Sequence, residues 1–555
     1  MALHHTSLGG RVLLLLATLL IAFSALFILQ TGSARAQEPP PPCGGKAEGV
    51  SDPCGDKTGT AADVTEDGSF DEDTVTNLLG HTKIAGNFAW IILCGALVLF
   101  FQSGFALVES GFTRHKNACH TMMMNFVIFA IGGIAWYLFG FALMFGGLGA
   151  LASVGGGTVV LDKMAHIGGD NWGLFGYKGW ALTGGTYDVG VLTFWFFQVV
   201  FMDTAGTIVT GGMAERWKWS AFCVYSFFMG AFIYPLFGAW TWGGGFLAKS
   251  GLSMDLGHGY VDFAGSGVVH AVGGWAALAG AMVIGPRIGK YNKDGTTNTI
   301  VGHSIPLAIL GVFILVFGWV GFNAGSSLNG QDLRISVVTV NTIIASCTGL
   351  LAAMFYAMMS EDYGKKPDAG ACCNGMLAGL VAVTAPCAFV APWAAFLIGA
   401  IGGLFTVVVY KFVDTKLKID DPVGAFSVHG VNGIWGLISV GIFADGTYGA
   451  GWNGVEGTVK GLLYGDASQL GAQVLGAVVV AAWAFGATYV FMKVQHAMFG
   501  IRVDPQVEIE GLDVHEMGSR GYEYGDYPTP AGADPMTGTW AEKSGAPVPV
   551  PVGAD

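Results

Sequence analysis

The chain has 555 residues, with 26 Lys or Arg, 39 Asp or Glu and a formal net charge of −13. Charged residues make up 12% of it and apolar residues 52%, whereas soluble domains carry about 25% charged residues. So few charges cannot cover a globular surface, which excludes a soluble enzyme, a disordered chain and a nucleic-acid binder.

The acidic charge is concentrated at the two ends of the chain. Residues 37–83 and residues 496–555 each carry ten acids and three bases, so the body between them is nearly neutral. The 88 glycines suit packed membrane helices, because small residues let helix backbones approach closely. We therefore expect an all-α integral membrane body with two acidic, soluble ends.

The first residues have the pattern of a secretory signal peptide. Arg11 precedes an apolar run over residues 12–29, and Ala34-Arg35-Ala36 follows as a small-residue cleavage pattern. These features predict a signal peptide over residues 1–36. The apolar run is long for a signal peptide, so an uncleaved anchor is the alternative.

An acidic leader follows the signal peptide. Residues 37–84 are rich in Pro, Gly and Asp, and we expect them to lie irregularly on the outer side of the membrane. Cys43 and Cys54 are predicted to form a disulfide there, because outer compartments are oxidising. Two free cysteines are the alternative.

The membrane domain is predicted over residues 85–495, with a soluble tail over residues 496–555. Eleven apolar segments are long enough to cross ~30 Å of hydrocarbon, the eighth and tenth only just. They lie near residues 85–108, 121–147, 190–213, 220–247, 264–285, 304–326, 335–359, 371–387, 391–412, 426–444 and 470–495.

Lys and Arg residues predict the orientation. One alternating set of loops holds twelve of them and the opposite set five, and the richer set is expected in the cytoplasm. The leader is then outside and the tail inside, which is also the arrangement that a signal peptide requires. The predicted location is the inner (cytoplasmic) membrane.

An internal repeat points to the functional site. Asp262 to Leu278 and Asp421 to Leu437 both read D-x7-H-x-V-x-G-x3-L. They fall on predicted spans five and ten, and this odd offset makes the two copies cross the membrane in opposite directions. The pattern predicts a five-plus-five inverted repeat with the substrate site at the interface of its halves.

The repeat places His270 and His429 inside two spans. Ionisable groups in hydrocarbon usually face an interior pathway, although two hydrogen-bonded core histidines are the alternative. Asp262 and Asp421 precede the spans. We expect each of these aspartates to cap the entry turn of its helix, with direct coordination of a cation as the alternative.

Several ordered blocks resemble the ammonium transporter (Amt/Mep/Rh) family, and its bacterial Amt type in particular. The resemblance covers about residues 85–520. The blocks are Asp262-Phe-Ala-Gly-Ser-Gly-Val-Val-His270, Gly285-Pro-Arg287, Gly212-Met-Ala-Glu-Arg216, Trp242-Gly-Gly-Gly245, Gly318-Trp-Val-Gly-Phe-Asn-Ala-Gly-Ser326, Asn341-Thr342, Asp420-Asp-Pro422, Val428-His-Gly430 and Glu510-Gly-Leu-Asp513.

The resemblance implies an eleven-helix homotrimer in the lipid bilayer, with one ammonium pore in each subunit. The site residues that it implies are Phe197, Trp242, Ser326 and Asp262 for recruitment of NH4+, Phe201 and Phe322 for a gate, and His270 and His429 for a pore-lining proton relay. Without the resemblance, Phe197 would be assigned to a lipid-facing aromatic run, and Trp242 to an interfacial belt.

Three further residues lie near these positions. Asp203 is an acid inside the third span, and it is either a buried hydrogen-bonded acid or an extra charge that attracts cations. Trp319 lies in the gate block and is a candidate accessory residue of the pore. Glu109, at the inner end of the first span, is expected to be structural.

The resemblance implies transport of ammonium across the membrane, and the chemistry of the residues is consistent with it. Bare NH4+ is prohibitively expensive in hydrocarbon, whereas a histidine relay can accept its proton. The alternatives are an ammonium sensor and a passive NH3 gas channel. A metal-dependent enzyme is not expected, because two histidines are too few ligands, and no cofactor is predicted.

The tail resembles the family's regulatory segment over Arg502 to Asp513. This likeness makes a PII-type nitrogen-regulatory protein a candidate partner at the cytoplasmic face. The family's closing H-G-E-x-A-Y block is matched only loosely, by His515 to Tyr522, which weakens that inference.

Overall fold

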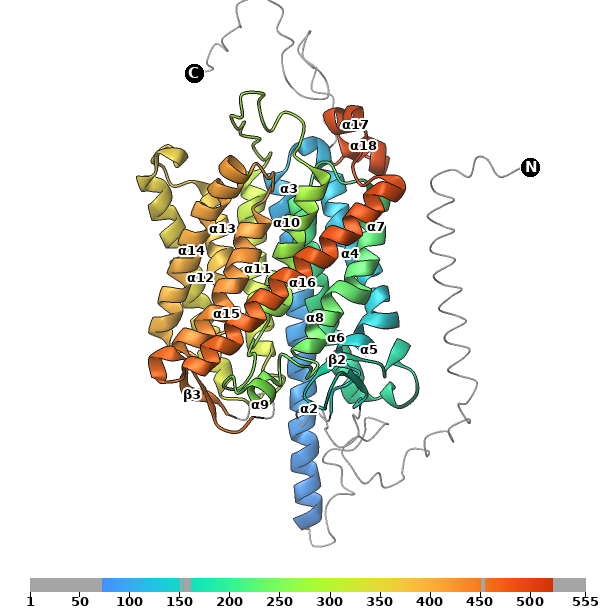
Figure 1. The fold of residues 1–555 in the computed structure, drawn as a ribbon, viewed down its shortest axis with the longest axis vertical. Helices are drawn as coiled ribbons and strands as arrows, with labels where there is room; N and C mark the ends of the chain where they lie inside the picture. Colours follow the sequence, from blue (N-terminus) through green and yellow to red (C-terminus); the bar gives the residue numbers. More distant parts are fainter. Residues whose placement is uncertain (1–71, 150–152, 154–160, 451–454, 523–555) are drawn as a thin grey trace, which may run out of the picture.

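The computed structural model describes residues 72–149, 153, 161–450 and 455–522 (Figure 1). The predicted signal peptide, the leader up to residue 71 with Cys43 and Cys54, and the tail from residue 523 lie outside the described residues. The predictions for those parts stay predictions.

The described part is a bundle of apolar helices with two small hairpins (Figure 1). Within these ranges, ten helices are long and apolar enough to cross a membrane, which confirms the all-α membrane class. They are Thr82–Phe112, His115–Phe145, Val189–Met213, Trp219–Trp240, Ser266–Ile284, Ile305–Gly325, Arg334–Met359, Pro392–Leu417, Phe426–Phe443 and Ala467–Phe499.

The first half of the bundle ends at Ile284. Its elements are α2 (Glu72–Leu99), α3 (Phe101–Phe112), α4 (Ala118–Ala135), α5 (Phe141–Phe145), β1 (Met164–His166), β2 (Gly173–Gly176), α6 (Val189–Met213), α7 (Trp219–Phe228), α8 (Tyr234–Trp240), α9 (Ser250–Met254) and α10 (Val272–Ile284). The strands β1 and β2 pair antiparallel.

The second half ends in the long helix α16 and the tail. Its elements are α11 (Ile305–Gly325), α12 (Arg334–Met359), α13 (Ala369–Thr384), α14 (Pro392–Phe412), α15 (Asn432–Phe443), β3 (Asp445–Ala450), β4 (Thr458–Lys460), α16 (Ala467–Phe499), α17 (Pro505–Glu510) and α18 (Leu512–Met517). The strands β3 and β4 also pair antiparallel.

Two elements differ from the sequence-based expectation. The helix α2 begins at Glu72, so the end of the leader, predicted to be irregular, is helical and projects beyond the bundle (Figure 1). This stretch contains no proline, and Glu72 and Asp73 suit a helix N-terminus. The helix α13 has 16 residues and spans only about 24 Å. Pro386 follows its end closely, and a proline there cannot continue the helical hydrogen bonding.

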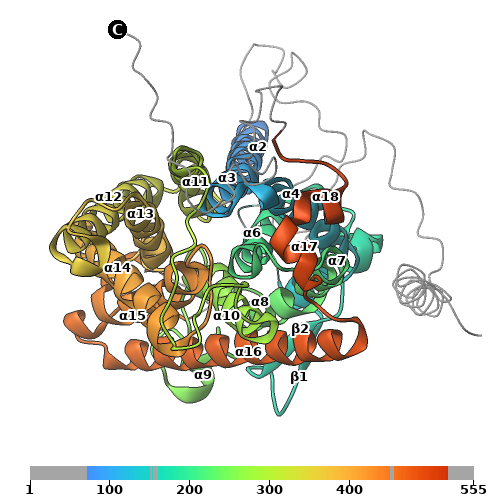
Figure 2. The ribbon, with the colours of Figure 1, turned by 90° about the horizontal axis from the view of Figure 1, so that it is seen from above.

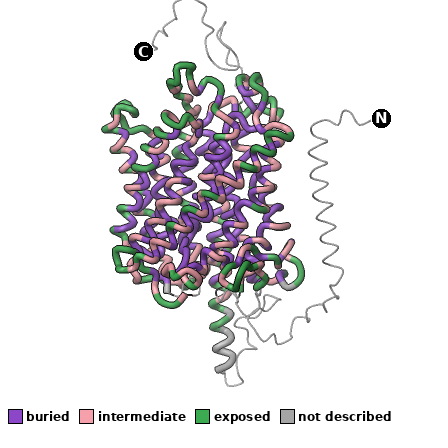
Figure 3. The backbone as a smooth tube through the Cα atoms, viewed as in Figure 1, coloured by how far each residue is buried: buried purple, intermediate pink, exposed green. Residues whose placement is uncertain are grey.

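The arrangement of the helices suits a bilayer. Buried residues fill the middle of the bundle, and exposed residues gather at its two ends (Figure 3). Large apolar side chains are exposed on the outer helices, for example Phe126 at 72% and Phe313 at 62%. Figure 2 shows α10 inside the bundle and α16 running along one side of it.

The two copies of the repeat have the same local structure. Each begins with a π-helical turn, Ser266–Ala271 or Phe426–Val431, which leads directly into α10 or α15. Turns of this type are rare in proteins and are frequent at functional sites. The shared D-x7-H pattern therefore corresponds to one shared backbone form.

Glycines let these two copies cross at close range. A Cβ added at Gly274 would lie 2.0 Å from the backbone nitrogen of Gly430. A Cβ added at Gly433 would lie 2.5 Å from the carbonyl oxygen of Ser266. No larger residue fits without a shift of backbone, so these glycines set the distance between the two histidine-bearing turns.

The helices α17 and α18 lie at one end of the bundle, at the top of Figure 1, and we call this the tail end. A charge cluster joins the loops at this end. Arg114 pairs with Glu215, and the Arg287 guanidinium donates to Asp420 at 2.8 Å and 2.9 Å. Burial raises the pKa of the Glu215 and Asp420 carboxyls, but neighbouring arginines outweigh burial and hold both pKa values below their usual range. Both carboxyls therefore stay ionised at neutral pH.

Acid should weaken this cluster. Groups with a depressed pKa stabilise the fold fully above their unfolded-state pKa of about 4, and this stabilisation is lost as the pH falls through the folded-state pKa. We expect Asp420→Asn to lower the thermal unfolding temperature in detergent at neutral pH, because Arg287 loses the nearer of its two charged partners, Asp420 and Glu215. We also expect the variant to lose less stability than the wild type below about pH 4. An unchanged unfolding temperature at neutral pH would contradict this role.

The close crossing at Gly433 has its own test. We expect Gly433→Ala to cost roughly 1–3 kcal/mol of stability, because an extra methyl group forces the two turns apart. Gly486 in α16 is a matched control, since a Cβ added there meets nothing within 4 Å. The measurement is the thermal unfolding temperature of Gly433→Ala and Gly486→Ala. Equal unfolding temperatures of the two variants would show that the crossing does not require glycine.

Candidate functional site

The two repeat histidines meet in the middle of the bundle. Nδ1 of His270 lies 3.2 Å from Nδ1 of His429, and the two rings stack at 5.3 Å between centroids. His270 has no exposed surface and His429 is 4% exposed. The Nε2 atom of His270 has no hydrogen-bond partner among the described residues. One Nδ1 must donate to the other, so the rings share a proton directly.

Asp262 and Asp421 fix the turns that carry the histidines. Asp262 accepts the backbone N–H groups of Gly265, Gly267 and Val268 and the hydroxyl of Tyr260. Asp421 accepts those of Gly424, Ala425 and Phe426. The expected caps are therefore present in both copies. Both Asp262 carboxylate oxygens are engaged within its own turn.

Two phenylalanines close the space on the side of His270 that faces away from His429. The rings of Phe201 in α6 and Phe322 in α11 stack at 4.2 Å between centroids, and neither has exposed surface. Phe322 also lies 5.4 Å from the His270 ring. The predicted gate residues thus form an apolar layer directly against the histidine pair.

The predicted recruitment residues lie on the far side of this layer. Trp242 contacts Phe201 edge to face at 6.0 Å and donates its indole N–H to the Asp262 carbonyl at 2.7 Å. Phe197 is buried and lies 4.7 Å from Phe201, so it does not face lipid. Ser326 follows α11, is partly exposed, and donates its hydroxyl to the Phe322 carbonyl at 2.8 Å.

The two accessory candidates differ in their surroundings. Trp319 stacks on His270 at 5.0 Å and donates its indole N–H to Thr384 at 2.9 Å, which fixes the His270 ring from one side. Asp203 is 1% exposed and lies beside the Gln102 side chain. Its Oδ1 atom has no hydrogen-bond partner in the described ranges. The nearby Thr204 hydroxyl donates to the Val200 carbonyl instead.

An acid that the sequence alone indicates to be structural, Glu109, lines a cavity together with His429. A small cavity of about 20 Å³ is lined by His429, Phe105, Val108 and Glu109, among others. The signal for it in the sequence was an acid within an apolar span. The spacing of residues alone does not place Glu109 beside a histidine that lies 320 positions later in the chain.

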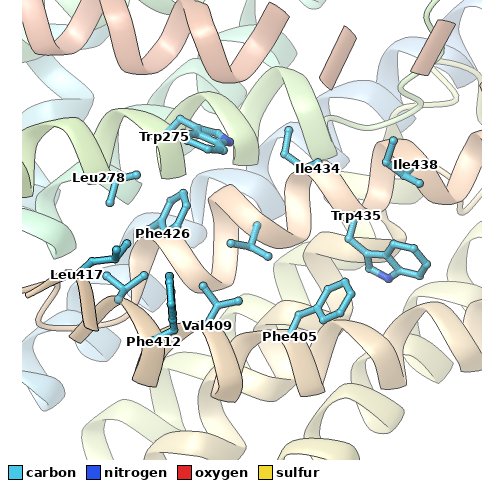
Figure 4. A pocket seen from close by; sticks show the side chains of 12 residues that line it. Trp275, Leu278, Phe405, Val409, Phe412, Leu417, Phe426, Ile434, Trp435 and Ile438 are labelled. Carbon is cyan, nitrogen blue, oxygen red and sulfur yellow. The ribbon is translucent and has the colours of Figure 1, made fainter. Parts of the chain in front are cut away.

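A second, larger hollow is apolar throughout. It has a volume of about 680 Å³ and lies between α10, α14 and α15 (Figure 4). Trp275, Phe405, Phe412 and Trp435 are among its lining residues, and no charged side chain lines it. It has no titratable side chain that could accept a proton from NH4+, so the histidine line is the better candidate site.

The arrangement forms one continuous line of rings. From Trp242 it runs through Phe201, Phe322 and His270 to His429, with centroid distances of 4.2–6.0 Å between neighbours. An aromatic face attracts a cation at the partly exposed end. An uncharged molecule can enter the buried apolar layer at a much lower energy cost than an ion, and the paired imidazoles can carry a proton.

Comparisons with known proteins identify the family. A model of the Ammonium Transporter Family matches residues 89–522. The ammonium transporter Amt2 of Archaeoglobus fulgidus is 44% identical over 454 residues, which cover 81% of this chain and 91% of that protein.

Solved structures give the same result. A protein described as a sensor Amt protein is 35% identical, with a TM-score of 0.68 over 78% of this chain and 99% of that one. The Mep2 protein of Candida albicans is 26% identical, with a TM-score of 0.63 over 76% of this chain and 86% of that one. The chain described here therefore belongs to the Ammonium Transporter Family.

Proposed function

We propose that this protein moves ammonium across the cytoplasmic membrane by separating NH4+ into NH3 and a proton inside the bundle. The observation that carries the proposal is the His270–His429 contact of 3.2 Å, next to the stacked phenylalanines Phe201 and Phe322. That contact places a proton-accepting group next to the apolar phenylalanine layer, where a charged ion is least stable.

The path begins at the partly exposed outer end. Trp242 offers a cation–π surface, which contributes ~0.5–2 kcal/mol depending on desolvation. Phe197 adds a second ring, and the Ser326 hydroxyl can accept an N–H from the ion. The Asp262 backbone carbonyl accepts the Trp242 indole N–H. The Asp262 carboxylate adds negative charge, although both its oxygens are engaged within its own turn. These residues concentrate NH4+ at the gate.

Magnitudes decide the form in which nitrogen passes the gate. Burying an isolated ion in a low-dielectric layer costs on the order of tens of kcal/mol in the idealised limit. One or two cation–π contacts offset only a small part of that cost. The ion therefore gives its proton to His270, which contacts Phe322 of this layer, and nitrogen continues along the histidine line as neutral NH3.

The proposal includes a topology. The ten long helices and the shorter α13 make eleven crossings, with a five-plus-five inverted repeat, the leader outside and the tail in the cytoplasm. Support comes from Figure 1, where the start of α2 and the helices α17 and α18 lie at opposite ends of the bundle. Membership of the family extends the proposal to a homotrimer with one pore in each subunit.

The tail belongs to the same proposal. Asp513 accepts the backbone N–H groups of Cys119 and His120 at the start of α4, and Glu516 accepts that of Trp219 at the start of α7. The tail thus holds the near ends of α4 and α7, and α4 packs against α6, which carries the gate residue Phe201. A PII-type regulatory protein can act on the tail at this face.

A sensor role is the second candidate function. It is favoured by the likeness to the protein described as a sensor Amt protein. Uptake of labelled methylammonium into vesicles that contain the purified protein tests the two functions against each other. A transporter fills the vesicles faster than protein-free controls, and a sensor that binds without passage does not.

The proton relay has a direct test in His270→Leu. We expect this variant to lose the ammonium-driven current or to change the charge carried per nitrogen, because the acceptor of the proton is removed. Leucine keeps the site apolar and filled. His496→Leu, on the exposed side of α16, is the matched control. Currents and a pH dependence like those of the wild type in His270→Leu would contradict the relay.

Recruitment by Trp242 should have a graded effect. Trp242→Leu removes a cation–π contact of ~1 kcal/mol, so we expect apparent affinity and selectivity for ammonium to fall several-fold and not completely. Competition by larger cations against labelled methylammonium measures both quantities. The exposed Trp393 in α14 provides the control variant Trp393→Leu, and equal behaviour of the two variants would refute the role of Trp242.

A further inference from the structure

Glu109 is a buried acid at the inner end of the histidine line. It lies in α3, is 2% exposed and lines the same small cavity as His429. Asn125 in α4 donates an N–H to its Oε2 at 2.9 Å, and the Thr210 hydroxyl in α6 lies 2.8 Å from both carboxyl oxygens. All these partners are neutral, and no Lys, Arg or His in the described ranges forms an ion pair with Glu109.

A carboxylate in such surroundings needs a positive charge. An ionised acid that is buried in a membrane protein without a cation is costly. Glu109 therefore favours a state in which it holds a proton or lies next to a cation. Since its protein neighbours supply no positive charge, that charge must arrive through the cavity.

The hydrogen bonds around Thr210 accommodate a protonated carboxyl. The Thr210 hydroxyl lies 2.5 Å from the Thr207 carbonyl oxygen as well as 2.8 Å from both oxygens of Glu109. A hydroxyl group has one proton and two acceptor lone pairs. If Thr210 donates to Thr207, a protonated Glu109 can donate to Thr210.

The cavity has the size of one small molecule. Its volume is about 20 Å³, and a site needs roughly 10–15 Å³ by this measure to hold one water. Ammonia and ammonium are close to water in size. A single molecule in this space is therefore in contact with both the last histidine of the line and the Glu109 side of the cavity.

We propose that Glu109 exchanges the proton at the inner end of the pore. The step rests on the proposed function. His429, protonated by the relay, passes its proton to the Glu109 carboxylate. The carboxyl then gives that proton to NH3, so an O–H bond breaks, an N–H bond forms, and NH4+ leaves toward the tail end. The carboxylate is restored for the next proton, and charge and atoms balance over the cycle.

The test compares Glu109→Gln with Thr210→Ala. Glutamine keeps the shape and the hydrogen bonds but cannot exchange a proton. We expect Glu109→Gln to lower the ammonium-driven current by about a hundredfold or more, from the lower end of the range for a lost acid–base group upward. Thr210→Ala removes the same link between helices and keeps the carboxyl, so we expect a smaller loss. A purely structural Glu109 would give losses of equal size, and that result would overturn the proposal.

A spectroscopic measurement covers the case in which Glu109→Gln fails to assemble. Adding ammonium to the wild-type protein should change the infrared C=O stretch of a protonated carboxyl group. Glu109→Asp should displace that band while keeping proton exchange, which assigns the signal. An ammonium-induced spectrum without a carboxyl band that responds to Glu109→Asp would overturn the proposal.

The outcomes also separate the two levels of the account. If the wild-type protein carries no ammonium, the proposed function fails and takes this step with it. If the wild type carries ammonium and Glu109→Gln carries it equally well with the same pH profile, only the role of Glu109 fails.

Discussion

The crossing of the two repeat turns is the constraint on which the site depends. Gly274 and Gly433 let the turns approach until a single added methyl group would collide with the opposite backbone. At that separation the two histidines touch through their Nδ1 atoms. Asp262 and Asp421 hold each turn in place by accepting its free N–H groups. Wider packing would separate the rings and break the line between the gate and the inner cavity.

Aromatic side chains close the centre of the bundle. Phe201 and Phe322 stack on each other, and Trp319 and Phe322 pack against His270. Such a layer excludes water and makes a charged ion very unstable there. The histidine pair and Glu109, which can take up or release a proton, lie on the inner side of the layer, and aromatic rings suited to a cation lie on its outer side. The order of these groups along one line gives the deprotonation mechanism its physical basis.

The sequence predicted the parts of the site that depend on a pattern. The D-x7-H repeat located both histidines and both caps, because equal spacing in two copies produces equal local structure. Ten predicted spans agree with long helices, with no end more than about seven residues off. The role of Ser326 as part of a recruitment site still rests on the family resemblance, since its hydroxyl bonds only to its own helix.

Other features depended on contacts between distant segments. Neither the π-helical form of the two turns nor the contact of Trp319 with His270 follows from spacing. Glu109 was assigned to structure because nothing in its own span showed that His429 lines the same cavity. Asp203 stays without an assigned role. It is buried beside Gln102, and neither the pattern nor its contacts explain why an acid stands there.

The most direct test of the central claim is the dependence of ammonium uptake on membrane voltage. Purified protein in sealed vesicles is given an ammonium gradient and a potential set by potassium and valinomycin, and labelled uptake is measured together with current. If NH3 and its proton both pass along the histidine line, uptake should increase when the vesicle interior is negative. It should also carry one positive charge per nitrogen. Uptake that is independent of the potential and produces no current would mean that only neutral NH3 crosses, and it would contradict the account.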